Sequence, residues 1–369
     1  MKKFWKITAF VTAACATVAF AGCSGCSSCN KNNKNLTVTN SNWYAGTSYK
    51  GIQPSFIVGE NSDYTPEVIE YKVEHVDATA VNGTYSAEYK DGKYKTEFYA
   101  MKYDWNNNPV YPQNKTETLY CYKTEFSISV QFKLKRTGET TELFNDSMTS
   151  VSYFRAAGKN LQPVYSRQEI VSASPANYQV SSLDQTYKKV NVNYDNYYSY
   201  DCGEVTTVTQ ENGGEKVTGK PYSFNQVKNS LFDNSSLYIA IRSMKLTTST
   251  SARFDLYSAA QGGVSSYTVS GQDTSMNEIE LKGISDEMAK NGLFTPAEGV
   301  NTVPAIAVNV NYAGGSLYGT TQTIWYAAVQ NDNNNTARAT MLKMTIPLSY
   351  NLGALNFTLK TIENTLWHK

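Results

Sequence analysis

Apolar and polar residues alternate with a period of two along most of the chain after residue 60, and this pattern is typical of antiparallel β-strands. In Val68–Val76, for example, Ile69, Tyr71 and Val73 fall on one face and charged residues fall mainly on the other. Thr118–Lys135 is the longest such segment. Others lie at 150–155, 189–194, 204–210, 215–222, 254–257, 264–269, 305–312, 321–329, 337–346 and 355–359. The pattern predicts a mainly β protein.

Turn signals separate several of these segments. Asp91-Gly92 stands between the alternating segments 85–90 and 93–99. It predicts a type I′ hairpin, because both central residues of that turn need positive φ. Residues 211–214 (ENGG) predict a second hairpin.

Helix signals are scarce. Leu237–Met244 follows the capping residues Asn234-Ser235-Ser236 and has apolar residues on one face, so it predicts a short helix. Ser285–Lys290 predicts a single helical turn, which Asn291-Gly292 would close.

These elements favour one large curved antiparallel sheet, a half-barrel or barrel-like form, with one or two short helices. We expect residues 38–312 to form the half-barrel-like region. Residues 313–369 are expected to add C-terminal strands that pack on the sheet or extend it. Hydrophobic residues make up 41% of the 369 residues, which is enough to build a core.

The N-terminal end has a different pattern. Three lysines within the first six residues precede the apolar segment Ile7–Ala21, which is shorter than the roughly twenty residues of a membrane-spanning helix. Gly22 and Cys23 follow. The segment resembles the signal peptide of bacterial lipoproteins, although Phe20 stands where leucine is usual. The resemblance implies that residues 1–22 are removed and that the Cys23 thiol carries the lipid anchor.

A lipid on Cys23 places the mature protein in the cell envelope, facing outside the cytoplasmic membrane, or in the outer membrane of an organism that has one. The whole chain has a net charge of +1; without residues 1–22, 30 basic residues face 32 acidic ones, a net charge of about −2. Such a chain has no electrostatic reason to bind nucleic acid or an anionic lipid surface. We therefore expect the lipid to be its membrane contact.

The remaining cysteines divide by position. Residues 23–37 contain few apolar side chains and predict a flexible tether that includes Cys26 and Cys29. Cys121 and Cys202 remain in the folded region. Outside the cytosol they are candidates for a disulfide, and the alternative is two small buried side chains that never touch.

Two segments, Asn160–Arg167 (NLQPVYSR) and Phe232–Leu246 (FDNSSLYIAIRSMKL), resemble parts of an uncharacterised family of envelope β-proteins. In that family a strand carries leucine, proline and a basic residue, and a later short helix carries Asp, Ser-Leu-Tyr, Arg and Leu. Its fold is similar to the lipoprotein carriers, in which a curved half-barrel wraps around a helical plug. The resemblance covers residues 60–275 and brings no catalytic residues. The last fifty or so residues are similar to tails of other uncharacterised bacterial lipoproteins.

The resemblance favours a lipid-anchored, non-catalytic protein that binds a hydrophobic ligand or a lipid-bearing partner inside the curved sheet. Phe232, Leu237, Ile241 and Met244 are then expected to line the cavity. Arg242 is expected to contact a polar head group. The alternative for all five residues is ordinary core packing.

The aromatic residues favour a second function. The chain has 28 tyrosines, and Tyr194, Tyr197 and Tyr198 lie among asparagines. With Trp105, such rings can cover the apolar faces of sugars while amides meet the hydroxyls, so the alternative is a surface module that binds glycan or protein. Tyrosine also suits half-buried sheet positions, so exposure of these four rings decides between the two interpretations.

Little in the sequence indicates catalysis. There are two histidines, His75 and His368, which leaves no histidine-rich metal cluster and little room for a Ser-His-Asp site. No phosphate-binding glycine loop and no Gly-x-Ser-x-Gly motif occur. We expect no enzyme activity, no cofactor and no metal.

Overall fold

The computed structural model describes residues 67–77, 85–135, 137–140, 142–157, 160–172, 190–225, 230–242, 246, 248, 251–272, 277–292, 296, 301–312, 321–328, 340–348 and 352–363. The predicted signal segment 1–22, the predicted tether 23–37 and Cys23 lie outside the described residues.

Strands dominate the described chain. The first seven are β1 (Glu67–Val76), β2 (Tyr85–Asp104), β3 (Thr116–Leu134), β4 (Phe144–Ala157), β5 (Asn160–Ser172), β6 (Val190–Ser199) and β7 (Glu204–Glu211). The others are β8 (Lys216–Thr218), β9 (Tyr222–Ser223), β10 (Ser230–Asp233), β11 (Ser251–Ser258), β12 (Gly263–Gly271), β13 (Asn277–Glu280), β14 (Thr302–Tyr312), β15 (Gln322–Ala327), β16 (Met341–Pro347) and β17 (Ala354–Glu363). The helical elements are η4 (Trp105–Asn107), η6 (Asn234–Ser236), α1 (Leu237–Arg242) and α2 (Asp286–Gly292).

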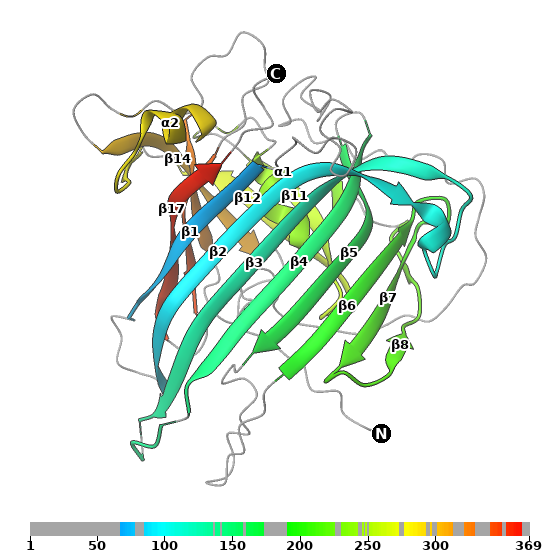
Figure 1. Cartoon of the computed structure of the whole chain (residues 1–369), viewed down its shortest axis with the longest axis horizontal. Helices are drawn as coiled ribbons and strands as arrows, with labels where there is room; N and C mark the ends of the chain where they lie inside the picture. The colour runs from blue at the N-terminus through cyan, green and yellow to red at the C-terminus, as the bar shows by residue number, and fades with distance from the viewer. Residues whose placement is uncertain are drawn as a thin grey trace.

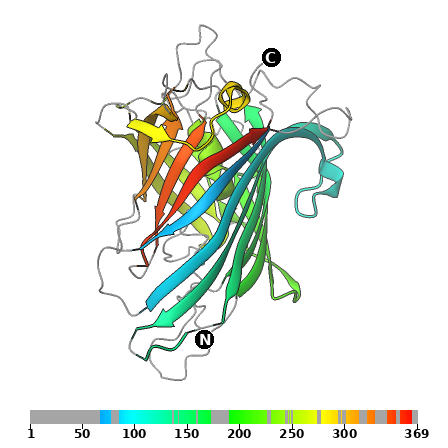
Figure 2. The same cartoon turned by 60° about the vertical axis from the view of Figure 1, so that its left-hand side comes forward.

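The strands form one curved sheet (Figures 1 and 2). From β1 to β7 each strand pairs with the next in antiparallel orientation. On its other side β1 pairs with β17, and the sheet continues through β16, β15 and β14 to β12, β11 and β10. Among the described ladders only β10 and β11 pair in parallel. The prediction of a mainly β, curved, barrel-like antiparallel sheet is confirmed.

The two ends of the sheet meet through side chains. No described ladder joins β10 or β11 to β7. Instead the hydroxyls of Tyr257 on β11 and Thr207 on β7 share a hydrogen bond of 2.7 Å. The Tyr257 ring also packs against Tyr198 and Tyr222, at centroid distances of 6.0 and 5.8 Å. The sheet is therefore barrel-like, with a seam that side chains close.

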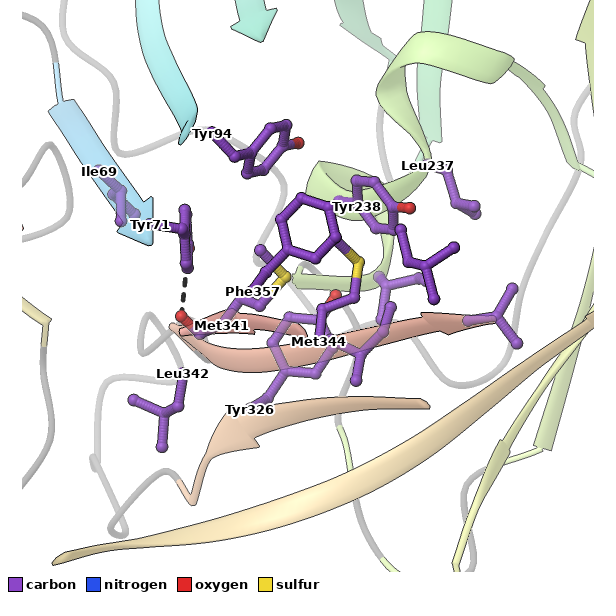
Figure 3. Close-up of a cluster of buried hydrophobic side chains, with 14 of the residues drawn as sticks. Ile69, Tyr71, Tyr94, Leu237, Tyr238, Tyr326, Met341, Leu342, Met344 and Phe357 are labelled. Atoms are coloured by element: carbon purple, nitrogen blue, oxygen red, sulfur yellow. Dashed lines mark hydrogen bonds between the residues drawn. The ribbon is translucent and has the colours of Figure 1, made fainter. Parts of the chain in front are cut away.

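A short buried segment fills the interior of the barrel-like sheet. It comprises Asp233, η6 and α1, and we call it the plug; all of its residues are buried. Asp233 caps η6 by accepting a 2.8 Å hydrogen bond from the backbone N–H of Ser235. Figure 3 shows Leu237 and Tyr238 of α1 gathered with wall side chains such as Tyr326 and Phe357 in one hydrophobic core.

The predicted hairpin at Asp91-Gly92 is wrong. β2 continues through both residues, and its register to β3 shifts between Lys90 and Lys93. Asp91 has a φ of 54°, so the pair forms a β-bulge within one long strand. A Cβ on Gly92 would lie 2.6 Å from the carbonyl oxygen of Val73 on β1. Glycine is needed here because the neighbouring strand approaches closely, and the chain does not reverse.

Other local predictions hold. The β7–β8 hairpin forms where expected, with positive φ at Asn212 and Gly213. α2 begins at Asp286, where the Ser285 hydroxyl accepts a hydrogen bond from the backbone N–H of Met288. α1 forms as predicted, and its described residues end at Arg242. Strands β15, β16 and β17 lie inside the sheet between β14 and β1.

Candidate functional site

The residues expected to line a ligand cavity lie in the packed core. Phe232 is 1% exposed, and Leu237 and Ile241 are both 0% exposed. A side chain without exposed surface has no water-sized space beside it, so no room for a ligand exists at these three residues. Met244 lies outside the described residues. For the described members of this group, the alternative of core packing is the correct one.

Arg242 is not available for a head group. Its Nη1 and Nη2 donate to the two carboxylate oxygens of Glu67 at 2.6 and 3.3 Å, and both side chains are buried. Glu67 is the first residue of β1, so this ion pair ties the end of the plug to the wall. The prediction of a free Arg242 is wrong, because a buried guanidinium without a carboxylate partner would be very costly.

A hydrogen-bond network holds the other end of the plug. One carboxylate oxygen of Asp233 accepts from the Ser166 hydroxyl at 2.6 Å and from the Tyr198 hydroxyl at 2.5 Å. Burial raises the pKa of Asp233, while its hydrogen bonds from Ser166, Tyr198 and Ser235 act in the opposite direction. This network binds the plug to β5 and β6 and has a structural role.

The predicted disulfide between Cys121 and Cys202 is wrong. Cys121 is a free, buried thiol on β3. Burial raises the pKa of this thiol to about 12, so it stays protonated. Cys202 is itself disulfide-bonded, to a partner other than Cys121.

The predicted cluster of exposed rings does not form as proposed. Tyr194, Tyr198 and Trp105 are buried, and of the four only Tyr197 is half-buried. Tyr194 and Tyr198 point into the core beside the seam, because they share the inward face of β6. Tyr197 has the opposite orientation on the same strand. Burial of three of the four rings favours half-buried sheet and core positions for them, and these four residues do not form a glycan-binding surface.

A protruding connection between β2 and β3 borders a pocket on the outside of the described sheet. The β2–β3 connection bends out of the sheet and turns back towards β7, as Figure 1 shows at the upper right. The backbone N–H of Trp105 donates a hydrogen bond of 3.0 Å to the backbone carbonyl of Lys115, which joins the two ends of the connection. At its tip the hydroxyls of Tyr111 and Thr206 of β7 share a 2.8 Å hydrogen bond. We call residues 104–115 the arm.

A pocket of about 140 Å³ lies where the arm meets the strand ends. It is lined by Trp105, Gln113, Lys115, Glu117, Arg155, Val164, Tyr198, Ser199, Tyr200 and Asp201. These residues come from the arm together with the start of β3, from β4, from β5, and from the end of β6 together with the turn after it. The pocket therefore depends on four segments that are far apart in the sequence.

Glu117 organises the charged side of this pocket. It accepts hydrogen bonds from Arg155 Nε and Nη2 at 2.7 and 2.9 Å, and from the Trp105 indole N–H at 3.0 Å. Burial alone would raise the pKa of Glu117, but Arg155, Trp105 and Lys115 together hold it below its ordinary value. A general acid needs a raised pKa, so Glu117 is suited to positioning other side chains.

Four half-buried tyrosines lie beside the pocket on the outer face. They are Tyr103 of β2, Tyr153 of β4, Tyr165 of β5 and Tyr197 of β6, and we call them the tyrosine row. Tyr153 pairs with Tyr165, and Tyr165 with Tyr197, directly across the ladders. Their ring centroids are 5.5 and 5.1 Å apart, and Tyr103 lies 6.1 Å from Tyr153. The row is thus a continuous aromatic strip across several strands.

The outer face next to the row is charged instead of aromatic. On β2 and β3, Lys95 pairs with Glu97 at 2.6 Å, and Lys123 pairs with Glu125 at 2.6 Å and with Glu97 at 3.7 Å. These ion pairs are half-buried and accessible to solvent, and such pairs contribute little to stability on a solvated sheet face. The change from charged to aromatic side chains sets the tyrosine row apart as a distinct surface.

Sequence reasoning missed most of these residues. Tyr153, Tyr165 and Tyr197 occupy outward positions of successive strands, but their alignment depends on the register of two ladders. The alternation within their own segments places Tyr153 and Tyr165 on the outward face, and this could have been read from the sequence. Nothing in the sequence indicates that Glu117 pairs with Arg155, which lies 38 residues away.

The described residues contain neither a metal-ligating cluster nor a membrane-spanning helix. No group of three or more His, Cys, Asp or Glu side chains is placed to hold a metal ion there. In the same residues, no helix has the length and apolar character needed to cross a membrane.

Comparisons with known proteins identify a likeness of fold alone. No family model matches the sequence, and no curated protein matches it. Among solved structures, a β-barrel-like protein of a domain of unknown function (DUF1849) from Brucella abortus is similar, with 10% identity and a TM-score of 0.41. The match covers 81% of this chain and 97% of that one. A likeness at this level says nothing about function.

Proposed function

We propose that the mature chain is a non-catalytic protein of the cell envelope, anchored by lipid on Cys23, that binds glycan at its tyrosine row. The observation that carries the proposal is the row itself, four half-buried rings in contact on the outer face of β2, β4, β5 and β6. Aromatic rings cover the apolar faces of sugars, and neighbouring polar groups meet the hydroxyls.

Buried polar side chains fix two hydroxyls of the row, and an accessible arginine lies beside it. The Tyr165 hydroxyl donates to Asp195 at 2.6 Å, and Arg167, at 40% side-chain exposure, lies 3.9 Å from the same carboxylate. The Tyr103 hydroxyl accepts from the Asn108 amide at 3.3 Å. Burial raises the pKa of Tyr197 to about 12, so this ring is neutral and keeps its hydroxyl proton as a donor.

The hydrophobic-ligand function that the sequence favoured has weaker support. It requires space beside α1, and Leu237 and Ile241 leave none. Arg242 is held by Glu67 and offers no group to a lipid head. The glycan-binding alternative instead uses residues that solvent reaches.

Affinity electrophoresis of the mature protein through gels that contain defined polysaccharides tests the proposal. We expect retardation by at least one polysaccharide, and about tenfold weaker binding for Tyr197→Ala, a change of ~1.4 kcal/mol. Lys95→Ala, on the charged outer face, serves as the matched control and should bind as the wild type does. Wild-type protein that no polysaccharide retards, or a Tyr197→Ala variant with unchanged binding, contradicts the proposal.

The anchor has its own test. Cells that express the full chain are labelled with an alkyne analogue of palmitate, and the labelled protein is detected after purification. We expect label on the wild type and none on Cys23→Ser. Label that persists in Cys23→Ser, with the wild type equally labelled, contradicts anchoring at Cys23.

A further inference from the structure

The pocket between the arm and the strand ends has the size of a single ring. Its volume is about 140 Å³, whereas pockets for drug-sized ligands measure about 300–1,000 Å³. A protein cavity of about 150 Å³ holds one benzene ring. The pocket therefore has room for about one six-membered ring.

The charges around the pocket cancel. Lys115 and Arg155 are cationic, and Glu117 and Asp201 are anionic, so the four lining residues have no net charge. An anionic ligand would meet two carboxylates, and a cationic ligand two cations. This balance favours a ligand without charge.

Two of these charged groups are free to bind a ligand. Asp201 is exposed and, within the described part of the chain, makes no ion pair. The Lys115 ammonium has only a loose ion pair of 3.6 Å to Glu117 and lies 4.6 Å from the centre of the Trp105 ring. Asp201 supplies acceptors and Lys115 supplies donors. Adjacent hydroxyls of a sugar both donate and accept, so they match this pair.

The remaining groups have fixed positions. Arg155 uses Nε and Nη2 on Glu117, and its guanidinium lies 5.7 Å from the Trp105 ring. Val164 gives the pocket an apolar wall and packs with Trp105 and Leu119. These contacts hold the pocket open without a ligand, because each side chain is already held by its neighbours.

We propose that this pocket binds one neutral pyranose ring of a glycan, with Asp201 as hydrogen-bond acceptor and Lys115 as donor. The inference rests on the proposed glycan-binding function and adds to it the class of sugar and a second contact site. The pocket and the tyrosine row meet at Trp105, against which Tyr103 packs at 5.4 Å. One glycan can therefore contact both.

Titration calorimetry with the methyl glycosides of glucose, galactose and mannose, and with the corresponding uronic acids, tests this inference. We expect at least one neutral glycoside to bind, the matching uronic acid to bind about tenfold more weakly, and added salt to change the neutral sugar's affinity little. Asp201→Asn should weaken binding of the neutral sugar about tenfold. Glu215→Gln, at an exposed acid in the β7–β8 turn, is the matched control and should leave binding unchanged.

The outcomes separate this inference from the proposed function. If polysaccharide binding is lost in Tyr197→Ala but survives in both Asp201→Asn and Lys115→Met, the pocket inference is wrong and the function stands. A preference for the uronic acid also overturns the inference. If wild-type protein binds neither polysaccharide nor glycoside, both proposals fail.

Discussion

The two ends of the plug are held by buried carboxylates in two different ways. At its C-terminal end Arg242 pairs with Glu67, and the ion pair is almost fully buried. At its N-terminal end Asp233 accepts hydrogen bonds from Ser166, Tyr198 and the backbone of Ser235. Among the described residues no cation pairs with Asp233. At the C-terminal end the carboxylate is paired with a cation, whereas at the N-terminal end it has only uncharged hydrogen-bond donors.

This difference separates a permanent contact from one that responds to pH. Burial alone would lower the pKa of Arg242, but Glu67 raises it above its ordinary value, so the guanidinium stays charged. Burial raises the pKa of Asp233, so its carboxyl takes up a proton more readily in the folded protein than in the unfolded chain. The Glu67 end should hold the plug at any ordinary pH, and the Asp233 end should weaken as the pH rises.

The largest effect is expected for Glu67→Gln. The substitution leaves the Arg242 charge buried beside a neutral amide, and breaking a buried ion pair in this way costs about 3–5 kcal/mol. Urea denaturation of the mature protein measures the change in the free energy of unfolding.

Glu70→Gln is the control for this change. Glu70 lies on the same strand and pairs with Lys360 at 3.4 Å, but both side chains are largely exposed. An exposed pair contributes at most about 1 kcal/mol. If the two substitutions lower the free energy of unfolding equally, burial of the Glu67–Arg242 ion pair does not increase its contribution to stability.

A smaller effect is expected for Asp233→Asn, about 1–2 kcal/mol, because the amide leaves one of the Ser166 and Tyr198 hydroxyls without its acceptor. In the wild type, the raised folded-state pKa means that stability falls as the pH rises from the ordinary carboxyl value of 3.8 through the folded-state pKa. The asparagine variant lacks this dependence. Its deficit should therefore be largest in acid and shrink towards neutral pH.

Urea denaturation of both proteins at several values between about pH 4 and pH 7 measures this trend. A deficit that is constant over the range, or that grows with pH, would mean that Asp233 ionises as an ordinary surface carboxyl does.

The sequence was informative about the wall and uninformative about these contacts. Alternation placed Ile69, Tyr71 and Val73 on the inward face because side-chain direction depends only on the strand's own period. The same reasoning misread Asp91-Gly92, since positive φ serves a bulge as well as a turn, and only the neighbouring β1 distinguishes them.

The candidate site could not be predicted, because its contacts join residues that lie far apart in the sequence. Glu67 and Arg242 are 175 residues apart, so the sequence presented Arg242 as a free cation. The apolar face of Leu237 and Ile241 suits a ligand cavity and a packed core equally well, and only the surrounding wall decides. The sequence left open whether Trp105 and Tyr198 are exposed, and in the structure both are buried.

The smallest effect, about 0.5–1.5 kcal/mol, is expected for Tyr198→Phe, which removes one hydroxyl donor from Asp233. With fewer hydrogen bonds to its charged form, the pKa of Asp233 should rise further, so the loss of stability should extend to higher pH than in the wild type. Tyr257→Phe is the matched control, because it removes the hydroxyl that bonds to Thr207 at the seam. It should cost a similar amount at every pH. If both variants show the same pH profile, the Tyr198 hydroxyl does not act through Asp233, and the plug's N-terminal end does not depend on protonation as the comparison requires.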